Sequence, residues 1–206
     1  VLLDIEGTTC PISFVAQTLF PYAASHLPGF LERHRQAPAI QRLVAELRQL
    51  WSDDPDPEAQ QLLRQAHASG ALGDGGDPAD SPTAIVPYVR HLIALDRKLT
   101  PLKDLQGMIW AEGYGQGDLI GPLFDDVEPM LRQWRQRGLR LSVYSSGSIS
   151  AQQLLYQHSN AGDLRPLFHR WYDTRTGAKQ APLSYGRISA DLGGKPWQQV
   201  KRRAFQ

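Results

Sequence analysis

Cysteine is almost absent from this chain, and that scarcity excludes one kind of stabilisation. Cys10 is the only cysteine among 206 residues, so no intrachain disulfide can form. A chain of this kind suits a reducing compartment, and we expect a cytoplasmic protein. A nucleophilic role for Cys10 is disfavoured, because the sequence places no base beside it.

Long apolar runs and a strong net charge are missing as well. No uninterrupted apolar stretch reaches the roughly 18 residues of a membrane span, and no signal peptide is visible. The formal net charge is +1, and the aromatic residues do not interleave with a basic patch. The six histidines lack the spacing of metal ligands. We therefore expect no membrane and no nucleic-acid partner, and a monomer that acts on a small molecule.

What the sequence does contain is the pattern of an α/β fold. Val1–Ile5 is a continuous apolar run, typical of a buried parallel strand. Alternating apolar residues predict a second strand over Leu139–Tyr144, with a helix beginning near Ile149. A weaker strand is predicted around Trp171. Strands that alternate with helices favour a Rossmann-like parallel sheet.

A long helical block interrupts this pattern. Between the first strand and about Gly121 the apolar residues recur at helical spacing, and no convincing strand is found. We therefore predict a discontinuous core, residues 1–13 and 122–206, with a helical cap inserted at 14–121. The polar Gly/Pro stretch Ser69–Pro82 is expected to be a loop of this cap.

A final helix is predicted over "APLSYGRISADLGG", which begins at Ala181. We expect Leu183, Ile188 and Leu192 to face inward and Gly193 to end the helix.

Chemically capable side chains follow each predicted strand. Asp4 and Glu6 come after the first strand, Ser145 and Ser146 follow the second and precede a helix, and Lys179 follows the third. In open α/β sheets, ligands bind at the carboxyl ends of the strands. A helix start offers free N–H groups that suit a phosphate. Each feature alone is also typical of an ordinary cap, turn or solvated lysine, and only their shared position indicates a site.

Three segments resemble one known family. "DIEGTTCPISF" is similar to the first motif of the enolase-phosphatases of methionine salvage, which belong to the haloacid-dehalogenase superfamily and usually have a Thr in place of Cys10. "VYSSGSISAQQLLY" resembles the second motif of that family, and "YDTRTGAKQAPLSYGRIS" resembles the third. The resemblance spans Val1 to about Ala190, and "LDRKLTPLKDLQGMIWAEGY" is similar to a segment of the cap.

The resemblance implies a magnesium-dependent phosphatase of known chemistry. Asp4 is implied as the nucleophile and Glu6 as the group that passes a proton, while Ser145 and Ser146 bind the phosphate and Lys179 neutralises charge. Asp4 and Glu6, the latter through its main-chain carbonyl, are implied ligands of Mg²⁺. The implied substrate is a small phosphorylated diketone, 2,3-diketo-5-methylthiopentyl-1-phosphate, which is enolised and dephosphorylated to an acireductone.

The resemblance ends near the C-terminus. The family continues with a strand and an Asp that helps to hold magnesium, whereas Gly194–Gln206 supplies no such residue. We therefore expect that the C-terminal part of the core is missing or altered and that the activity of the chain suffers. Two alternatives stay open: a broader phosphatase without the enolase step, and an inactive, truncated binding module. A nucleotide kinase is disfavoured, because "GALGDGGDP" lacks a preceding strand and a Gly-Lys-Ser/Thr ending.

Overall fold

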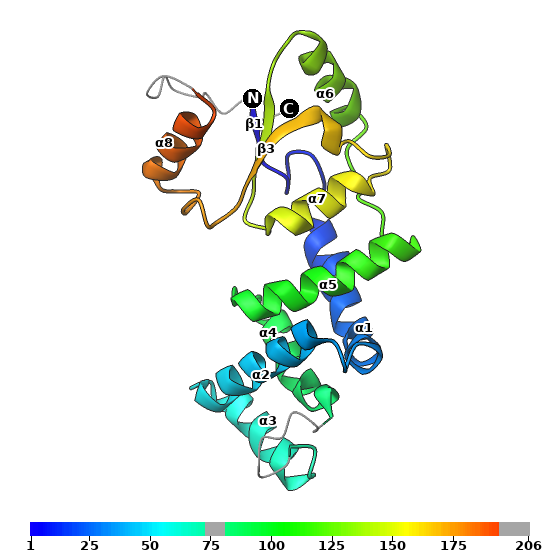
Figure 1. The fold of residues 1–206 in the computed structure, drawn as a ribbon, viewed down its shortest axis with the longest axis vertical. Helices are drawn as coiled ribbons and strands as arrows, with labels where there is room; N and C mark the ends of the chain where they lie inside the picture. Colours follow the sequence, from blue (N-terminus) through cyan, green and yellow to red (C-terminus); the bar gives the residue numbers. More distant parts are fainter. Residues whose placement is uncertain (73–80, 194–206) are drawn as a thin grey trace. The chain divides into compact units, whose positions relative to one another are not determined.

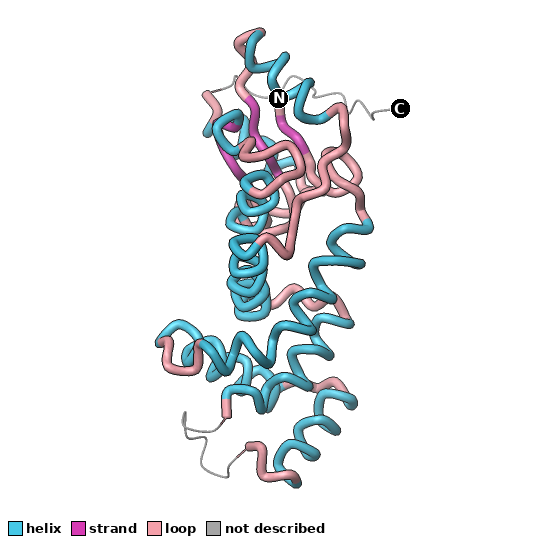
Figure 2. Tube along the Cα trace, turned by 90° about the vertical axis from the view of Figure 1, so that its right-hand side faces the viewer, coloured by secondary structure: helices cyan, strands magenta, loops and turns pink. Residues whose placement is uncertain are grey.

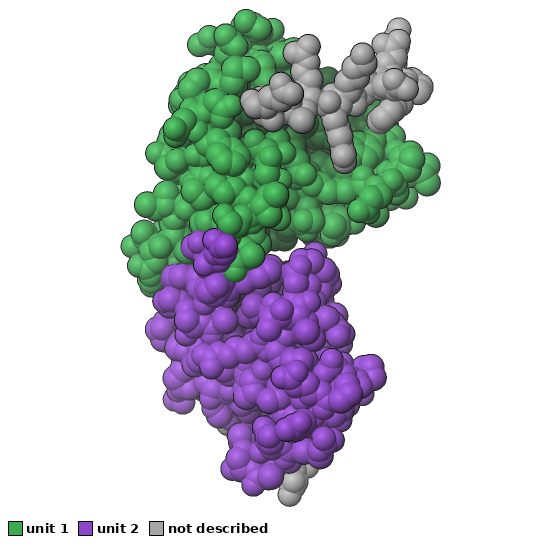
Figure 3. All heavy atoms as spheres, turned by 180° about the vertical axis from the view of Figure 1, so that it is seen from behind, with its two compact units in different colours: residues 1–16, 113–206 green, residues 17–112 purple. Residues whose placement is uncertain are grey.

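The computed structural model describes residues 1–72 and 81–193. Part of the predicted cap loop, residues 73–80, and the C-terminal segment 194–206 lie outside the described residues. The chain divides into two compact units, coloured separately in Figure 3. The first unit joins Val1–Ala16 to the residues from Gly113 onward, and the second is Gln17–Glu112. The sequence-based boundaries of the cap, 14 and 121, lie three and nine residues outside this second unit.

The first unit is an α/β structure built on a parallel sheet. Within the described residues the sheet has three strands: β1 (Leu2–Leu3), β2 (Leu141–Tyr144) and β3 (Phe168–Tyr172). The strand β2 is central and pairs in parallel with both neighbours. The strands are drawn in magenta in Figure 2. The parallel α/β fold predicted from the sequence is therefore confirmed.

Two strands are shorter than the sequence predicts, for local reasons. The first ends at Leu3 because the Asp4 carboxylate Oδ1 accepts the N–H of Ile5 at 2.8 Å, which removes that donor from the strand ladder. The second begins at Leu141, because the N–H of Leu139 closes a turn onto the carbonyl of Trp134 at 3.0 Å. The second strand ends at Tyr144, as the sequence predicts, whereas the first ends two residues before the predicted Ile5.

Helices alternate with the strands along the chain in the first unit (Figure 1). The helix α6 (Val127–Gln136) precedes β2, and α8 (Pro182–Asp191) follows β3. Between β2 and β3 lie α7 (Ile149–Gln157) and the 3₁₀-helix η3 (Arg165–Leu167). A small apolar cluster joins the sheet to α8. It contains Tyr144, Tyr172 and Ile188, each less than one-tenth exposed. This packing holds the loop between β3 and α8 at the edge of the sheet.

The prediction that Leu183 faces inward is wrong. Its side chain is 77% exposed, whereas Ser184 is buried at 2%. The spacing explains the error: Ser184 lies four residues before Ile188 and shares its face, while Leu183 lies five residues before it and is turned away. The Ser184 hydroxyl donates to the carbonyl of Ala178 at 2.8 Å, which satisfies its burial.

The second unit is helical in its described residues. Its elements are the end of the π-helix η1 (Val15–Leu19), α1 (Phe20–Arg33), α2 (Pro38–Asp53), α3 (Pro57–Ala68), the 3₁₀-helix η2 (Pro82–Ile85), α4 (Val86–Ala94) and most of α5 (Thr100–Gln116). None of the helices in the described part of the chain combines the length and apolar character of a bilayer crossing.

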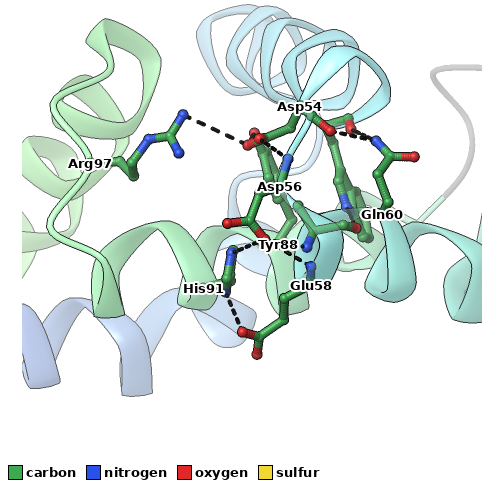
Figure 4. A network of polar contacts seen from close by, with 9 residues as sticks. Asp54, Asp56, Glu58, Gln60, Tyr88, His91 and Arg97 are labelled. Carbon is green, nitrogen blue, oxygen red and sulfur yellow. Dashed lines mark hydrogen bonds and ion pairs between the residues drawn. The ribbon is translucent and has the colours of Figure 1, made fainter.

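A polar network joins α2, α3 and α4 inside this unit (Figure 4). The carboxylate of Asp54, only 6% exposed, accepts the Tyr88 hydroxyl at 2.9 Å and the N–H of Asp56 at 3.0 Å. The Asp56 carboxylate in turn caps α3 by accepting the N–H of Glu58, and lies 3.3 Å from Nε2 of His91. The short segment between α2 and α3 is therefore an ordered, hydrogen-bonded corner.

Candidate active site

The site begins at the end of β1, where Asp4 meets a lysine from a distant loop. The Nζ of Lys179 lies 2.5 Å from Asp4 Oδ1, and the two side chains are 28% and 42% exposed. The same Oδ1 accepts the N–H of Ile5, so this oxygen and the plane of the carboxylate are held. Among the described residues, no hydrogen-bond partner of Asp4 Oδ2 is recorded. One carboxylate oxygen of Asp4 therefore faces the ammonium group of Lys179, and the other is left for a ligand.

Glu6 lies on the tight loop that follows. The carbonyl of Ile5 accepts the N–H groups of Thr8 and Thr9 at 3.0 and 2.8 Å, which folds the chain back on itself. Gly7 has φ of +70°, a left-handed conformation that strains other residues, and its N–H donates to the carbonyl of Cys10. The half-buried Glu6 is thereby kept next to the end of β1, two residues from Asp4.

The chemistry of Cys10 supports the expectation that it is not a nucleophile. The side chain is fully buried. Burial, together with the nearby carboxylates of Glu6 and Asp4, raises the pKa of the thiol to about 12. A thiol with such a pKa stays protonated at neutral pH, and the thiolate is the reactive form.

The third component is the loop between β2 and α7. Ser145 is buried, and its N–H donates to the carbonyl of Tyr172 at 3.2 Å; Ser146 is exposed. Ser148 caps α7, since its hydroxyl accepts the N–H of Ala151 at 3.3 Å. No partner within the described residues is recorded for the consecutive N–H groups of residues 146, 147 and 148. This loop can therefore donate several hydrogen bonds to an anion.

These parts lie at one edge of the sheet. Because β2 pairs in parallel with β1 and β3, the residues that follow the three strands share the carboxyl edge. The contact between Asp4 and Lys179 joins the first and last of these loops directly. Asp4 and Lys179 are thus in contact, while Glu6 and the serine loop are placed at the same edge by the sheet topology, and the individual roles of these residues stay predictions.

Sequence reasoning missed Asp173, which directly follows β3. Its side chain is 4% exposed, and its carboxylate accepts the N–H of Ile149 at 3.4 Å and pairs with the Arg175 guanidinium at 2.8 Å. Burial alone would raise the pKa of Asp173, but the hydrogen bonds from Arg175 outweigh it and hold the pKa below the ordinary value. A signal was present, since Asp173 follows its strand as Asp4 follows β1.

The oxygen donors present fit part of a magnesium site. Carboxylate and carbonyl oxygens, as Asp4 and Glu6 offer, are the ligands that Mg²⁺ prefers. Within residues 1–72 and 81–193, however, no group of three or more His, Cys, Asp and Glu side chains is placed to hold a metal. The described residues therefore offer the oxygen donors of Asp4 and Glu6 to the implied site but no group of three such side chains.

Comparison with known proteins identifies the family of the chain. The family model for haloacid dehalogenase-like hydrolases matches residues 1–200. Enolase-phosphatase E1 of Synechococcus sp. (strain RCC307) is 49% identical over 93% of this chain and 72% of its own length. Enolase-phosphatase E1 of Thioalkalivibrio sulfidiphilus is 43% identical over 95% of this chain and 76% of its own length. The crystal structure of the UTR4 protein of Saccharomyces cerevisiae aligns with a TM-score of 0.62 and 32% identity, covering 94% of this chain and 75% of that one.

The chain belongs to the haloacid dehalogenase-like hydrolases. Within that family it groups with the enolase-phosphatase E1 proteins, as the first and second motifs of the sequence predict.

Proposed function

We propose that this chain is the enolase-phosphatase of methionine salvage. It enolises 2,3-diketo-5-methylthiopentyl-1-phosphate and hydrolyses the phosphate ester to give an acireductone. The observation that carries the proposal is the pairing of Asp4 with Lys179 at the sheet edge shared with the serine loop, in a chain 49% identical to an enolase-phosphatase E1. Nucleophile, cation and anion-binding loop are the parts that phosphoryl transfer requires.

The proposed phosphatase reaction has two steps. In the first, an Asp4 carboxylate oxygen attacks phosphorus, the bond from phosphorus to the ester oxygen breaks, and that oxygen takes a proton from Glu6. In the second, water attacks the aspartyl-phosphate, gives its proton to Glu6, and releases inorganic phosphate and the Asp4 carboxylate. Lys179 balances the negative charge that gathers on Asp4 and the phosphoryl oxygens.

Binding of the phosphate falls to the loop between β2 and α7. The hydroxyls of Ser145 and Ser146 and the N–H groups of the loop would surround the phosphoryl oxygens. Magnesium, when bound by Asp4 and the main-chain carbonyl of Glu6, would supply further positive charge against the phosphate. We assign the helical unit, Gln17–Glu112, the role of the cap that selects the methylthio tail.

The decisive experiment removes the nucleophile. Asp4→Asn keeps the size of the side chain and its hydrogen bond to Ile5, but an amide cannot form the aspartyl-phosphate. Phosphate release from the diketone phosphate should fall below about a tenth of the wild-type rate. The control is Asp163→Asn, since Asp163 is an exposed carboxylate paired only across two residues with Arg165. Equal rates in the two variants would overturn the proposed mechanism.

The same assay separates the two alternatives. A broader phosphatase would turn over simple phosphate esters at rates comparable to the diketone phosphate, with no acireductone product. An inactive binding module would release no phosphate at any magnesium concentration. The proposed enzyme releases phosphate and acireductone together, with a rate that rises to saturation as magnesium is added.

A further inference from the structure

The loop that carries Ser145 and Ser146 is held from behind by a buried glutamine. Gln152 lies on α7 and is 2% exposed. Its side-chain Nε2 donates to the carbonyl of Gly147 at 2.8 Å and to the carbonyl of Tyr172 at 2.9 Å. One amide group therefore ties the loop to the last residue of β3.

Two further contacts join the same segments. The carbonyl of Tyr172 also accepts the N–H of Ser145 at 3.2 Å, and the adjacent Asp173 accepts the N–H of Ile149 at 3.4 Å. Both ends of the loop are thus fixed to the carboxyl end of β3, while Gln152 holds its middle.

The contact with Gly147 fixes the direction of a neighbouring donor. A trans peptide is planar, and its carbonyl and the following N–H point in opposite directions. Since the carbonyl of Gly147 is bound by Gln152, the N–H of Ser148 is turned to the other side of the loop. That N–H is one of the consecutive donors with no recorded partner among the described residues.

Packing alone does not explain why a glutamine occupies this buried position. Gln152, Leu155 and Tyr156 are the buried residues of α7, at the spacing of one helix face. The Gln152 Oε1 has no hydrogen-bond partner in the described part of the chain. A buried unpaired acceptor destabilises the fold, and an apolar side chain of the same length would avoid this. Compared with such an apolar side chain, the amide of Gln152 adds the two hydrogen bonds that its Nε2 donates.

We propose that Gln152 is a positioning residue for phosphate binding, which orients the loop of Ser145–Ser148 by holding the carbonyl of Gly147 and tying it to the end of β3, with Asp173 anchoring the start of α7. The inference rests on the proposed function, because it assigns the phosphate to this loop. It predicts that phosphate affinity depends on a side chain that does not touch the phosphate.

The test compares Gln152→Met with Gln153→Met in the full chain. Methionine keeps the length and lacks the donors, and Gln153 is the adjacent residue on α7 but only partly buried. Inorganic phosphate is the probe, through its inhibition constant, together with kcat and KM for the diketone phosphate. We expect Gln152→Met to raise the inhibition constant and KM about 10- to 100-fold, because small misplacements of a binding group cost this much. Gln153→Met should stay within about twofold of wild type.

Thermal unfolding of both variants separates positioning from stability. A structural role alone would lower the melting temperature of Gln152→Met and leave the phosphate constants of the folded protein unchanged, which would overturn the inference. Should Gln152→Met not fold, Gln152→Asn serves instead, since it keeps an amide one methylene shorter; wild-type phosphate constants in Gln152→Asn would also overturn the inference. A wild-type chain that neither binds nor releases phosphate overturns the proposed function itself, and the inference with it.

Discussion

Gly177 sets the position of the loop that carries Lys179, and its replacement tests that geometry. Its φ is +143°, a conformation that residues with a side chain rarely adopt. A Cβ built on Gly177 would lie 2.2 Å from the Ser184 Oγ and 3.2 Å from the Ser184 Cβ. The backbone is also anchored there, because the Tyr144 hydroxyl donates to the carbonyl of Gly177 at 2.8 Å. Gly177→Ala therefore forces the Ser184 hydroxyl, the loop or α8 to move.

The expected cost follows from these contacts. Holding a non-glycine residue in such a conformation costs about 1–3 kcal/mol. Relief of the clash requires the Ser184 hydroxyl to rotate, which gives up its hydrogen bond to the carbonyl of Ala178, about 0.5–1.5 kcal/mol. We expect Gly177→Ala to lower the free energy of unfolding by about 2–4 kcal/mol. Because Lys179 lies two residues further on, kcat/KM should fall as well.

The chain offers a control substitution that should change the free energy of unfolding in the opposite direction. Gly186 lies inside α8, and a Cβ at this residue would meet nothing within 4 Å. Gly186→Ala should stabilise the protein by about 0.5–1 kcal/mol, since it removes glycine from a helix. Urea unfolding monitored by circular dichroism measures both variants, and hydrogen exchange of α8 localises the effect. Equal stabilities of the two variants would refute the steric argument.

A double-mutant cycle of Gly177→Ala and Ser184→Ala isolates the contact with Ser184. In a Ser184→Ala background the nearest atom is gone, so Gly177→Ala should cost about 1 kcal/mol less than in the wild type. An unchanged cost would mean that the backbone conformation, and not the close approach to α8, limits this position.

Three further predictions concern single side chains. Lys179→Met should lower kcat/KM about 10²- to 10³-fold, because it removes the cation at Asp4. The control is Lys103→Met, which changes a lysine on α5, and equal rates in the two variants would contradict this role. Glu6→Gln should slow turnover about 10²- to 10⁴-fold while the inhibition constant of inorganic phosphate stays nearly constant; the reverse pattern would make Glu6 a binding residue. The pKa of Asp56 is lowered in the folded state, mainly because its carboxylate accepts the N–H of Ala59. Ionised Asp56 therefore stabilises the fold at pH values above its unfolded pKa, and this stabilisation is lost as the pH falls through the folded pKa. Asp56→Ala should therefore destabilise the protein at neutral pH and weaken the acid dependence of urea unfolding, which an unchanged pH profile would disprove.

The end of β2 at Tyr144 was predictable from the sequence, whereas β1 ends two residues before the predicted Ile5 for a local reason. Asp4 closes its strand by taking the N–H of Ile5, and this is a short-range effect of an acid after an apolar run. Once three strands are parallel, geometry alone brings their carboxyl ends to one edge. The contact of Asp4 with Lys179 thus follows from the order of the elements, although the residues are far apart in the sequence.

Burial of polar side chains was harder to predict. Gln152 was passed over, although it lies three and four residues before Leu155 and Tyr156 and so shares their apolar face. A polar residue on such a face must find partners, and these are carbonyls of a loop and a strand that periodicity does not locate. Ser184 was missed for the same reason: its partner is the carbonyl of Ala178, in the loop preceding its own helix.

The charges at the sheet edge connect these residues to the need for a cation. Asp173 is paired with Arg175, and Asp4 with Lys179, so two of the carboxylates are already balanced. Glu6 adds one negative charge to these four side chains, so the five together are net negative before a ligand binds. A phosphate dianion would meet the hydroxyls of Ser145 and Ser146, the loop N–H groups and a lysine already shared with Asp4, and such dipoles offset part of its two negative charges. The described residues can therefore orient a phosphate more readily than they can neutralise it. From this imbalance we expect the proposed reaction to need a divalent cation at Asp4 and Glu6. We also expect its rate to be more sensitive to magnesium than the affinity for phosphate is to any single side chain of the loop.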